Sequence, residues 1–374
     1  MILDRPQVAY YDFPLRAAAD RQAVKDLLRE VAASGEFILK RRVQEFEQQL
    51  CAQIGVAHAV CVSSGTSAIH VAIAALGAGP GDEVLTPAFS FHSSATPIAL
   101  LGAKPVFVDV GKDFLVDPER IADAATQRTR GIVPVHLFSA MADMPAIASL
   151  ARGSGWWVLE DSAIALGMSW DDVAAGRWGD LGLFSFHPAK PLPGVTDGAA
   201  IVTDDEELAQ RCRMLRNHGQ DGVTRFLHHL VGFNARMDDV NAGLLSRRLR
   251  GYREWTIVRR EIARRYDEAF ADLTPALCTP STTPCERVYY TYVVRSPERD
   301  ALERHLAASG IETVVYYPRP LHLQRSFAFL GHREGDFPNA ERAAREALAL
   351  PLYPSMPAGD VDRVVDAVRA FHGD

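Results

Sequence analysis

The segment GLFSFHPAK, residues 182–190, is the most informative part of this chain for its fold. It begins as an apolar strand and ends, after a short loop, in Lys190. An earlier apolar run, WWVLEDSA at 156–163, carries the carboxylate of Asp161. A Lys just past one buried strand and an Asp at the end of another suit pyridoxal 5'-phosphate (PLP). The Lys holds the aldehyde of PLP as a Schiff base, and the Asp keeps the pyridine nitrogen protonated so that the ring acts as an electron sink.

Apolar strands alternate with helical stretches along the first part of the chain. We expect two helical runs within 22–54, further helices at 91–101 and 141–152, and strands at 58–62, 83–87, 105–110, 131–137, 156–161, 182–186 and 199–203. Continuous apolar strands separated by helices are typical of a parallel sheet that is covered on both faces. The sequence therefore predicts an α/β protein with a mostly parallel central sheet flanked by helices.

The pattern changes after residue 235. The Arg-rich run 235–270 has helical periodicity, which predicts one long helix with a solvated charged face that links two domains. Strands near 288–295 and 312–317 and helices near 298–309 and 338–348 then predict a smaller α+β domain. We divide the chain into a large PLP-binding domain, 1–240, and the linking helix with the small domain, 241–374. The N-terminal segment is expected to pack on the small domain.

Composition and charge exclude several classes of protein. The 374 residues are 48% hydrophobic and 23% charged, as in ordinary globular proteins, and the net charge is −7. A negative chain gives no basis for a nucleic-acid partner or an anionic membrane surface. We expect no membrane span, no secretory leader and no metal site. The five scattered cysteines predict reduced thiols in a cytoplasmic protein.

The segment SSGTSA, residues 63–68, marks a passage from strand to helix. Backbone N–H groups and the positive end of a helix dipole form a phosphate site there, and small side chains allow close approach. The candidates are Ser64, Gly65, Thr66 and Ser67. Taken alone, the motif is equally consistent with an ordinary Ser N-cap. No Lys follows the glycine at Walker spacing.

Taken together, these segments resemble the sugar aminotransferase family named after DegT and StrS, which are PLP enzymes of fold type I. The resemblance spans nearly the whole chain, in order. Its main segments are SGEFILKRRVQEFEQQLCAQIG (34–55), VSSGTSAIHVAI (62–73), PAFSFHSSATPIALLGAKPVFVDV (87–110), LEDSA (159–163), GDLGLFSFHPAK (179–190), GFNARMDDVNAGLL (232–245) and YYPRPLHLQ (316–324).

The resemblance implies a role for each matching residue. Lys190 forms the Schiff base, and Asp161 pairs with the pyridinium nitrogen. Ser185 donates its hydroxyl to the phosphate, beside the 64–67 turn, and the ring of Phe91 covers the cofactor. Asn234 matches the residue that reaches the phosphate of the neighbouring subunit, which implies a homodimer with shared active sites.

Other positions depart from the family pattern. Ile164 stands where the family usually has Gln or His in contact with the phenolic oxygen of the cofactor, and it cannot form a hydrogen bond. Tyr290 and Tyr316 replace two histidines, and Lys40–Arg41 replace the usual Gly-Pro. We take Lys40, Tyr290, Tyr316 and His322 as candidate substrate contacts.

By resemblance, the chain transfers an amino group from an amino acid, usually glutamate, to a keto sugar. The loop PLPGVT, 191–196, is similar to the longer loop of members that aminate a nucleoside-diphosphate-linked 3-keto-6-deoxyhexose in amino-sugar or antibiotic biosynthesis. The altered lining leaves a keto-cyclitol or another small ketone as an alternative substrate. The dehydratase branch, which replaces the Schiff-base Lys by His, is disfavoured by Lys190. A non-catalytic PLP-binding homologue that acts as a partner protein is the alternative from a different class.

Overall fold

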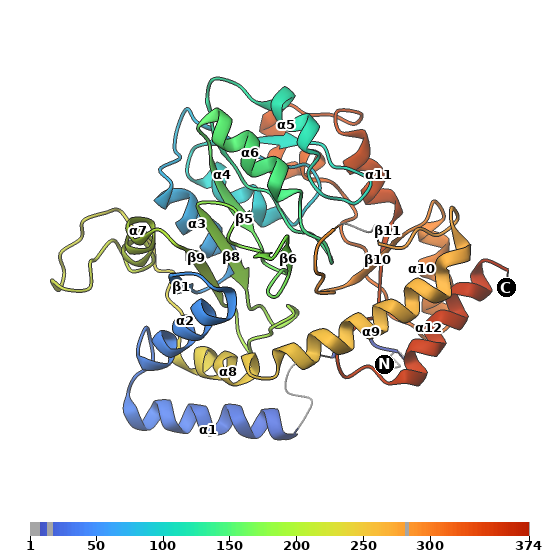
Figure 1. Cartoon of the computed structure of the whole chain (residues 1–374), viewed down its shortest axis with the longest axis horizontal. Helices are drawn as coiled ribbons and strands as arrows, with labels where there is room; N and C mark the ends of the chain where they lie inside the picture. Colours follow the sequence, from blue (N-terminus) through green and yellow to red (C-terminus); the bar gives the residue numbers. More distant parts are fainter. Residues whose placement is uncertain (1–7, 13–17, 281–283, 374) are drawn as a thin grey trace.

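The computed structural model describes residues 8–12, 18–280 and 284–373. The centre of this described part is a seven-stranded sheet in the order β1–β9–β8–β5–β4–β2–β3 (Figure 1). Its strands are β1 (His58–Val62), β2 (Glu83–Pro87), β3 (Lys104–Val108), β4 (Thr129–Ile132), β5 (Trp157–Asp161), β8 (Leu181–Ser185) and β9 (Ala199–Thr203). Only β9 runs against its neighbours, β1 and β8, and the other pairs are parallel. The predicted α/β class and mostly parallel sheet are confirmed.

Helices cover both faces of the sheet, which explains why its strands are apolar on both sides. Along β1, Val60 and Val62 pack with α3 (Gly65–Ala75) and α7 (Glu206–Arg216), whereas Ala59 and Cys61 pack with α2 (Arg41–Ile54) and α8 (Asp239–Leu249). This alternation follows from the two-residue period of a strand. The remaining helices of this part are α1 (Ala18–Ser34), α4 (Thr96–Leu100), α5 (Pro118–Ala124) and α6 (Met144–Ser154), with η1 (His92–Ser94) and the short strands β6 (Ser169–Trp170) and β7 (Val173–Ala174).

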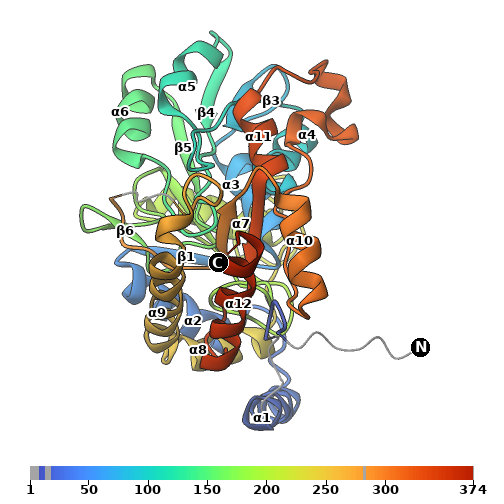
Figure 2. The ribbon, with the colours of Figure 1, turned by 90° about the vertical axis from the view of Figure 1, so that its right-hand side faces the viewer.

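The C-terminal part of the chain forms a second apolar cluster. Here α9 (Tyr252–Phe270) runs from the large sheet toward α10 (Arg299–Ala308) and α12 (Ala358–Phe371), which pack on each other (Figures 1 and 2). The other elements are η2 (Ala271–Leu273), β10 (Tyr292–Arg295), η3 (Leu321–Leu323), η4 (Arg325–Leu330), α11 (Pro338–Glu346) and β11 (Ala347–Leu350). Val8 joins this cluster and bridges Ile311. The division at residues 240 and 241 stays a prediction.

The single long helix predicted over 235–270 is wrong. The structure has two helices, because α8 ends at Leu249 and α9 begins at Tyr252. Gly251 lies between them with φ −98° and ψ 3°, outside the helical region. A glycine in an otherwise helical pattern is the weakest point for continuing the helix.

Other predicted elements differ as well, including two in the C-terminal part. The strand predicted at 312–317 reduces to one bridge, between Val314 and Ala349, while the rings of Tyr316 and Tyr317 pack in an aromatic cluster. The helix predicted at 338–348 ends at Glu346, and the following ALAL segment forms β11, which pairs with β10. All four residues of β11 are buried, so sheet packing overrides the helical preference of Ala and Leu.

Candidate active site

The ends of two neighbouring strands bring Asp161 and Ser185 to one edge of the sheet. Strands β5 and β8 are parallel and adjacent, with Asp161 opposite Leu183, so both strands end at the same edge. The chain then forms a loop that returns to Phe186. The Phe186 carbonyl accepts a hydrogen bond from Gly194 N at 2.7 Å, and the Phe186 N–H donates to Gly198 O at 2.8 Å. This loop carries Lys190 over the strand ends.

Asp161 is a buried carboxylate that lacks a full counter-charge. Burial raises the pKa of its side chain, while the Ala163 N–H, the nearby Lys190 ammonium and His136 lower it. The N–H of Ala163 donates to Oδ1 at 3.2 Å. A cation placed against this carboxylate would therefore be stabilised, because a buried anion gains from any opposite charge.

The 63–68 turn lies beside Ser185, as a phosphate cradle requires. Ser64 is the N-cap of α3, and its Oγ accepts from Ser67 N at 3.1 Å. The backbone N–H groups of Gly65 and Thr66 lie in the first turn of this 11-residue helix, where N–H groups have no acceptor within the helix. A Cβ on Gly65 would lie 3.3 Å from both Cβ and Oγ of Ser185. The ordinary N-cap and the phosphate site are thus the same turn, and glycine keeps the space next to Ser185 open.

A cluster of phenols stands over Lys190. The amine of Lys190 lies 4.7 Å from the centroid of the Tyr290 ring. The Tyr290 hydroxyl is 3.4 Å from that of Tyr11, which in turn bonds to the hydroxyl of Tyr316. Burial raises the pKa of Tyr290 and Tyr316, so both are neutral phenols at physiological pH. The cluster offers hydroxyl donors and acceptors beside the amine.

Phe91 and Ile164 border this region in different ways. The side chain of Phe91 is 59% exposed, and its ring lies 6.1 Å from that of Tyr317. Such an exposed aromatic ring is available to cover a ligand. Ile164 is buried in an apolar cluster with Met168 and Val288, against which Tyr290 also packs. The side chain at position 164 therefore has no polar atom.

Three predicted residues make hydrogen bonds with other parts of the described structure. Asn234 is exposed, and its Oδ1 accepts from Arg236 Nε at 3.0 Å. Lys40 is exposed before α2, with its N–H bonded to Asp239. His322 is buried, and its Nε2 lies 3.1 Å from Glu341 Oε1. Its ring serves an internal contact, and its role in substrate binding stays a prediction.

Sequence reasoning missed four residues near the site. Tyr11 and Tyr317 lie in the phenol cluster, and Tyr317 is buried close enough to Asp161 for the carboxylate to raise the pKa of the phenol further, beyond the effect of burial. The Arg259 and Arg248 side chains line a cavity of about 220 Å³ together with Lys190. The signals in the sequence were a YY pair near the N-terminus, the second Tyr of YYPRPLHLQ (316–324) and two arginines within an Arg-rich run.

A model of the DegT/DnrJ/EryC1/StrS aminotransferase family matches residues 18–369. The chain belongs to this family. The "pleiotropic regulatory protein" of Geobacillus stearothermophilus is 42% identical to this aminotransferase, over 92% of the chain and 93% of that relative. A dTDP-3-amino-3,4,6-trideoxy-alpha-D-glucose transaminase of Micromonospora megalomicea subsp. nigra is 39% identical, over 96% and 97%. DesV of S. venezuelae, solved in complex with a ketimine intermediate, has a TM-score of 0.94 at 36% identity, with 99% of each chain covered.

Aminotransferases of this family depend on PLP, and the residues present fit that cofactor. The open space between Gly65 and Ser185, next to the start of α3, suits a phosphate group. The under-compensated carboxylate of Asp161 suits a protonated pyridine nitrogen, and Lys190 supplies the amine. The contacts of Lys190, Asp161, Ser185, Phe91 and the 64–67 turn with PLP stay predictions.

Proposed function

We propose that this aminotransferase moves an amino group from glutamate to a nucleoside-diphosphate-linked 3-keto-6-deoxyhexose in amino-sugar or antibiotic biosynthesis. The observation that carries the proposal is that Lys190 lies close to both the Asp161 carboxylate and the Tyr290 ring. The printed activity of the Micromonospora relative, a dTDP-amino-sugar transaminase, supports the sugar nucleotide. The neutral hydroxyls of Tyr290 and Tyr316 suit the hydroxyl groups of a sugar.

The chain's own residues then have distinct tasks. When bound, PLP supplies an electron sink for the bond between the substrate carbon and its hydrogen. Lys190 would hold the cofactor, and its Nζ, once freed by the amine of the donor, would move the proton from that carbon to the aldehyde carbon of PLP. Asp161 orients and stabilises the cationic ring nitrogen. The Tyr290 ring holds the Lys190 side chain at the reacting centre.

The experiment is a comparison of two half-reactions. Glutamate alone should change the absorption of the purified PLP-loaded protein, and a keto sugar should reverse the change. A panel of nucleotide-linked keto sugars and free keto-cyclitols then identifies the acceptor. If only cyclitols reverse the absorption change, the acceptor is a keto-cyclitol and not a sugar nucleotide. A cofactor absorption that does not respond to any amino acid would favour a non-catalytic PLP-binding homologue that acts as a partner protein. The name of the Geobacillus relative, a regulatory protein, is consistent with that class.

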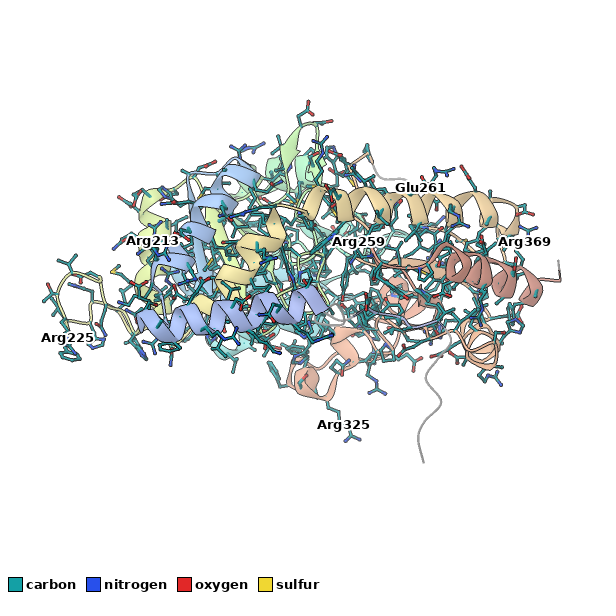
Figure 3. All side chains as sticks on the ribbon, turned by 90° about the horizontal axis from the view of Figure 1, so that it is seen from below. Arg213, Arg225, Arg259, Glu261, Arg325 and Arg369 are labelled. Atoms are coloured by element: carbon teal, nitrogen blue, oxygen red, sulfur yellow. The ribbon has the colours of Figure 1, made fainter. Side chains whose placement is uncertain are left out.

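We also propose a homodimer with shared active sites. The loop between α7 and α8, which carries Arg225, projects from the body of the subunit (Figures 1 and 3). Val223, Phe226 and Val231 on this loop are 88%, 72% and 97% exposed. Exposed apolar side chains on a projecting loop favour burial against another protein surface. Asn234 at the base of the loop would reach the phosphate of the partner subunit.

Mixed dimers test this arrangement. A dimer of one Lys190→Ala subunit and one Asn234→Ala subunit has one fully intact site if Asn234 acts across the interface. That site should bind PLP with wild-type affinity. If Asn234 acts within its own subunit, the only site with a lysine also lacks the asparagine, and it should bind as weakly as the Asn234→Ala homodimer. A monomer in solution would remove the proposal altogether.

The cytoplasm is the proposed location. All five cysteines are free thiols in the structure, as a reducing compartment requires. Across the described ranges, none of the helices combines the length and apolarity needed to cross a membrane.

A further inference from the structure

A cavity of about 220 Å³ opens on the side of Lys190 that faces α9. Its walls include the aromatic rings of Trp255 and Tyr353, and its floor is the loop that carries Lys190. A single water needs about 10–15 Å³ of such space, so this cavity can hold a small organic acid. Lys190 is one of the residues that line this cavity, so the lining influences which substrate group can enter from this side.

Arg259 brings a positive charge to this cavity without an acidic partner. The side chain is 7% exposed, and its Nη1 donates to the carbonyl oxygens of Tyr289 at 3.0 Å, Tyr290 at 3.2 Å and Leu352 at 3.3 Å. Its Nε is buried without a hydrogen-bond partner. Among the described residues, no carboxylate pairs with this guanidinium. In Figure 3, Arg259 and the exposed Glu261 lie on opposite sides of α9.

Arg248, Asp20 and Asp12, which also line the cavity, have polar partners of their own. Arg248 donates to Pro193 O at 2.6 Å and lies 3.6 Å from Asp20, so it fixes the Lys190 loop and balances that acid. Asp12 accepts from the Ser355 hydroxyl. Arg259 is therefore a guanidinium that lines this cavity and has no paired carboxylate among the described residues. A buried guanidinium with unused N–H groups gains most from a carboxylate, which it can bind through two hydrogen bonds.

We propose that Arg259 binds a carboxylate of the amino donor in this cavity. The inference rests on the proposed use of glutamate as donor. The amine of the donor must reach the centre held by Lys190, and its carboxylate is attached to the reacting carbon. A carboxylate therefore has to be accommodated next to Lys190, and Arg259 offers a cation in the same cavity. The keto sugar carries no carboxylate, so the two substrates depend on Arg259 to different degrees.

The test uses glutarate, a dicarboxylate that has no amine and cannot react. Its binding to the PLP-loaded protein is followed through the absorption of the cofactor on Lys190. We expect glutarate to compete with glutamate and Arg259→Met to weaken glutarate by about 30-fold or more, as for loss of one partner of a buried charge pair. Arg259→Lys should fall between these values. Arg253→Met, on an exposed position of the same helix, should have no effect.

Two measurements keep the outcome decisive. The reaction of the amine-loaded form with the keto substrate should change by less than about threefold in Arg259→Met, whereas equal losses in both half-reactions would overturn the inference. If this variant does not fold, a crystal of the wild-type protein with glutarate decides, because a carboxylate bound away from Arg259 contradicts the proposal. Wild-type protein that never responds to glutamate would instead reject the proposed donor, so the two failures are distinguishable.

Discussion

The amine of Lys190 lies over the ring of Tyr290, 4.7 Å from its centroid. A cation over an aromatic face is stabilised by about 0.5–2 kcal/mol, depending on its hydration. The same ring ends in a hydroxyl, 3.4 Å from that of Tyr11. Tyr290 thus contacts the Lys190 amine through the face of its ring and the phenol cluster through its hydroxyl.

Substitutions of Tyr290 separate these two tasks. Tyr290→Phe keeps the ring and should leave the glutamate half-reaction within about twofold, while the KM for the keto substrate rises as one hydroxyl is lost. Tyr290→Leu also removes the aromatic face and should slow the glutamate half-reaction by about tenfold or more, because the amine is less well placed. Stopped-flow absorption measures both. Equal effects of the two variants on the glutamate step would show that the ring does not position Lys190.

Gly65→Ala tests the phosphate cradle. The added Cβ would lie 3.3 Å from Ser185 Cβ and Oγ and would narrow the space for a phosphate, so PLP affinity should fall by about tenfold, or roughly 1.4 kcal/mol. Gly153→Ala is the matched control, because it is also in a helix and its Cβ meets nothing within 4 Å. Fluorescence titration of the cofactor-free proteins gives both affinities. Unchanged affinity in Gly65→Ala would place the phosphate elsewhere.

Asp161→Asn should have opposite effects on the cofactor-free and loaded proteins. Burial raises the folded-state pKa of Asp161 above its ordinary value of 3.8, so its contribution to stability is fully present below that value and is lost as pH rises through the folded pKa. A neutral Asn avoids this loss of stability. The cofactor-free variant should therefore have a higher melting temperature than the wild type near pH 7, and the difference should become smaller toward acid pH. The loaded variant should gain less stability from PLP and lose about 100-fold or more in kcat. Thermal melts from pH 3.8 up to about pH 8, with and without PLP, measure these differences. A cofactor-free variant less stable than the wild type at neutral pH would contradict this account of Asp161.

Ile164→Gln introduces the polar group that the resemblance to the family leads us to expect at this position. In the cofactor-free protein the buried amide lacks a partner in its apolar cluster and should cost about 1–3 kcal/mol of unfolding free energy. In the loaded protein an oxygen of PLP can accept a hydrogen bond, so the cost should be smaller and the absorption maximum should shift. Ile164→Leu is the control and should cost under about 1.5 kcal/mol in both forms. The same loss in both forms of Ile164→Gln, without a spectral shift, would mean that position 164 does not face the cofactor.

Much of the fold was predictable because its strands are continuous apolar runs. The residues that end such runs could be placed from sequence, since parallel strands end at one edge of a sheet. Asp161 and Ser185 are of this kind, and the 64–67 turn follows β1 in the same way. Lys190 follows one loop later, and its position depends on the hydrogen bonds that close that loop.

The rest of the site depends on packing between distant segments. Tyr11 meets Tyr316 only because residues 8–12 lie against the C-terminal part of the chain, and no local pattern encodes that contact. The sequence predicted Arg259 as part of a solvated charged helix face. In the structure it is buried, and its guanidinium donates to three carbonyls of other segments. The interruption of the helix at Gly251 was not predicted, because the Arg-rich helical pattern continues on both sides of this residue.

The central claim is that Lys190 holds PLP covalently. Reduction of the loaded protein with borohydride fixes any imine between PLP and a lysine, and peptide mapping by mass spectrometry then locates it. We predict the reduced cofactor on the peptide that contains Lys190, with no labelling in Lys190→Ala, although that variant keeps the wild-type fold. Labelling of another lysine, or none in the wild-type protein, would contradict the account.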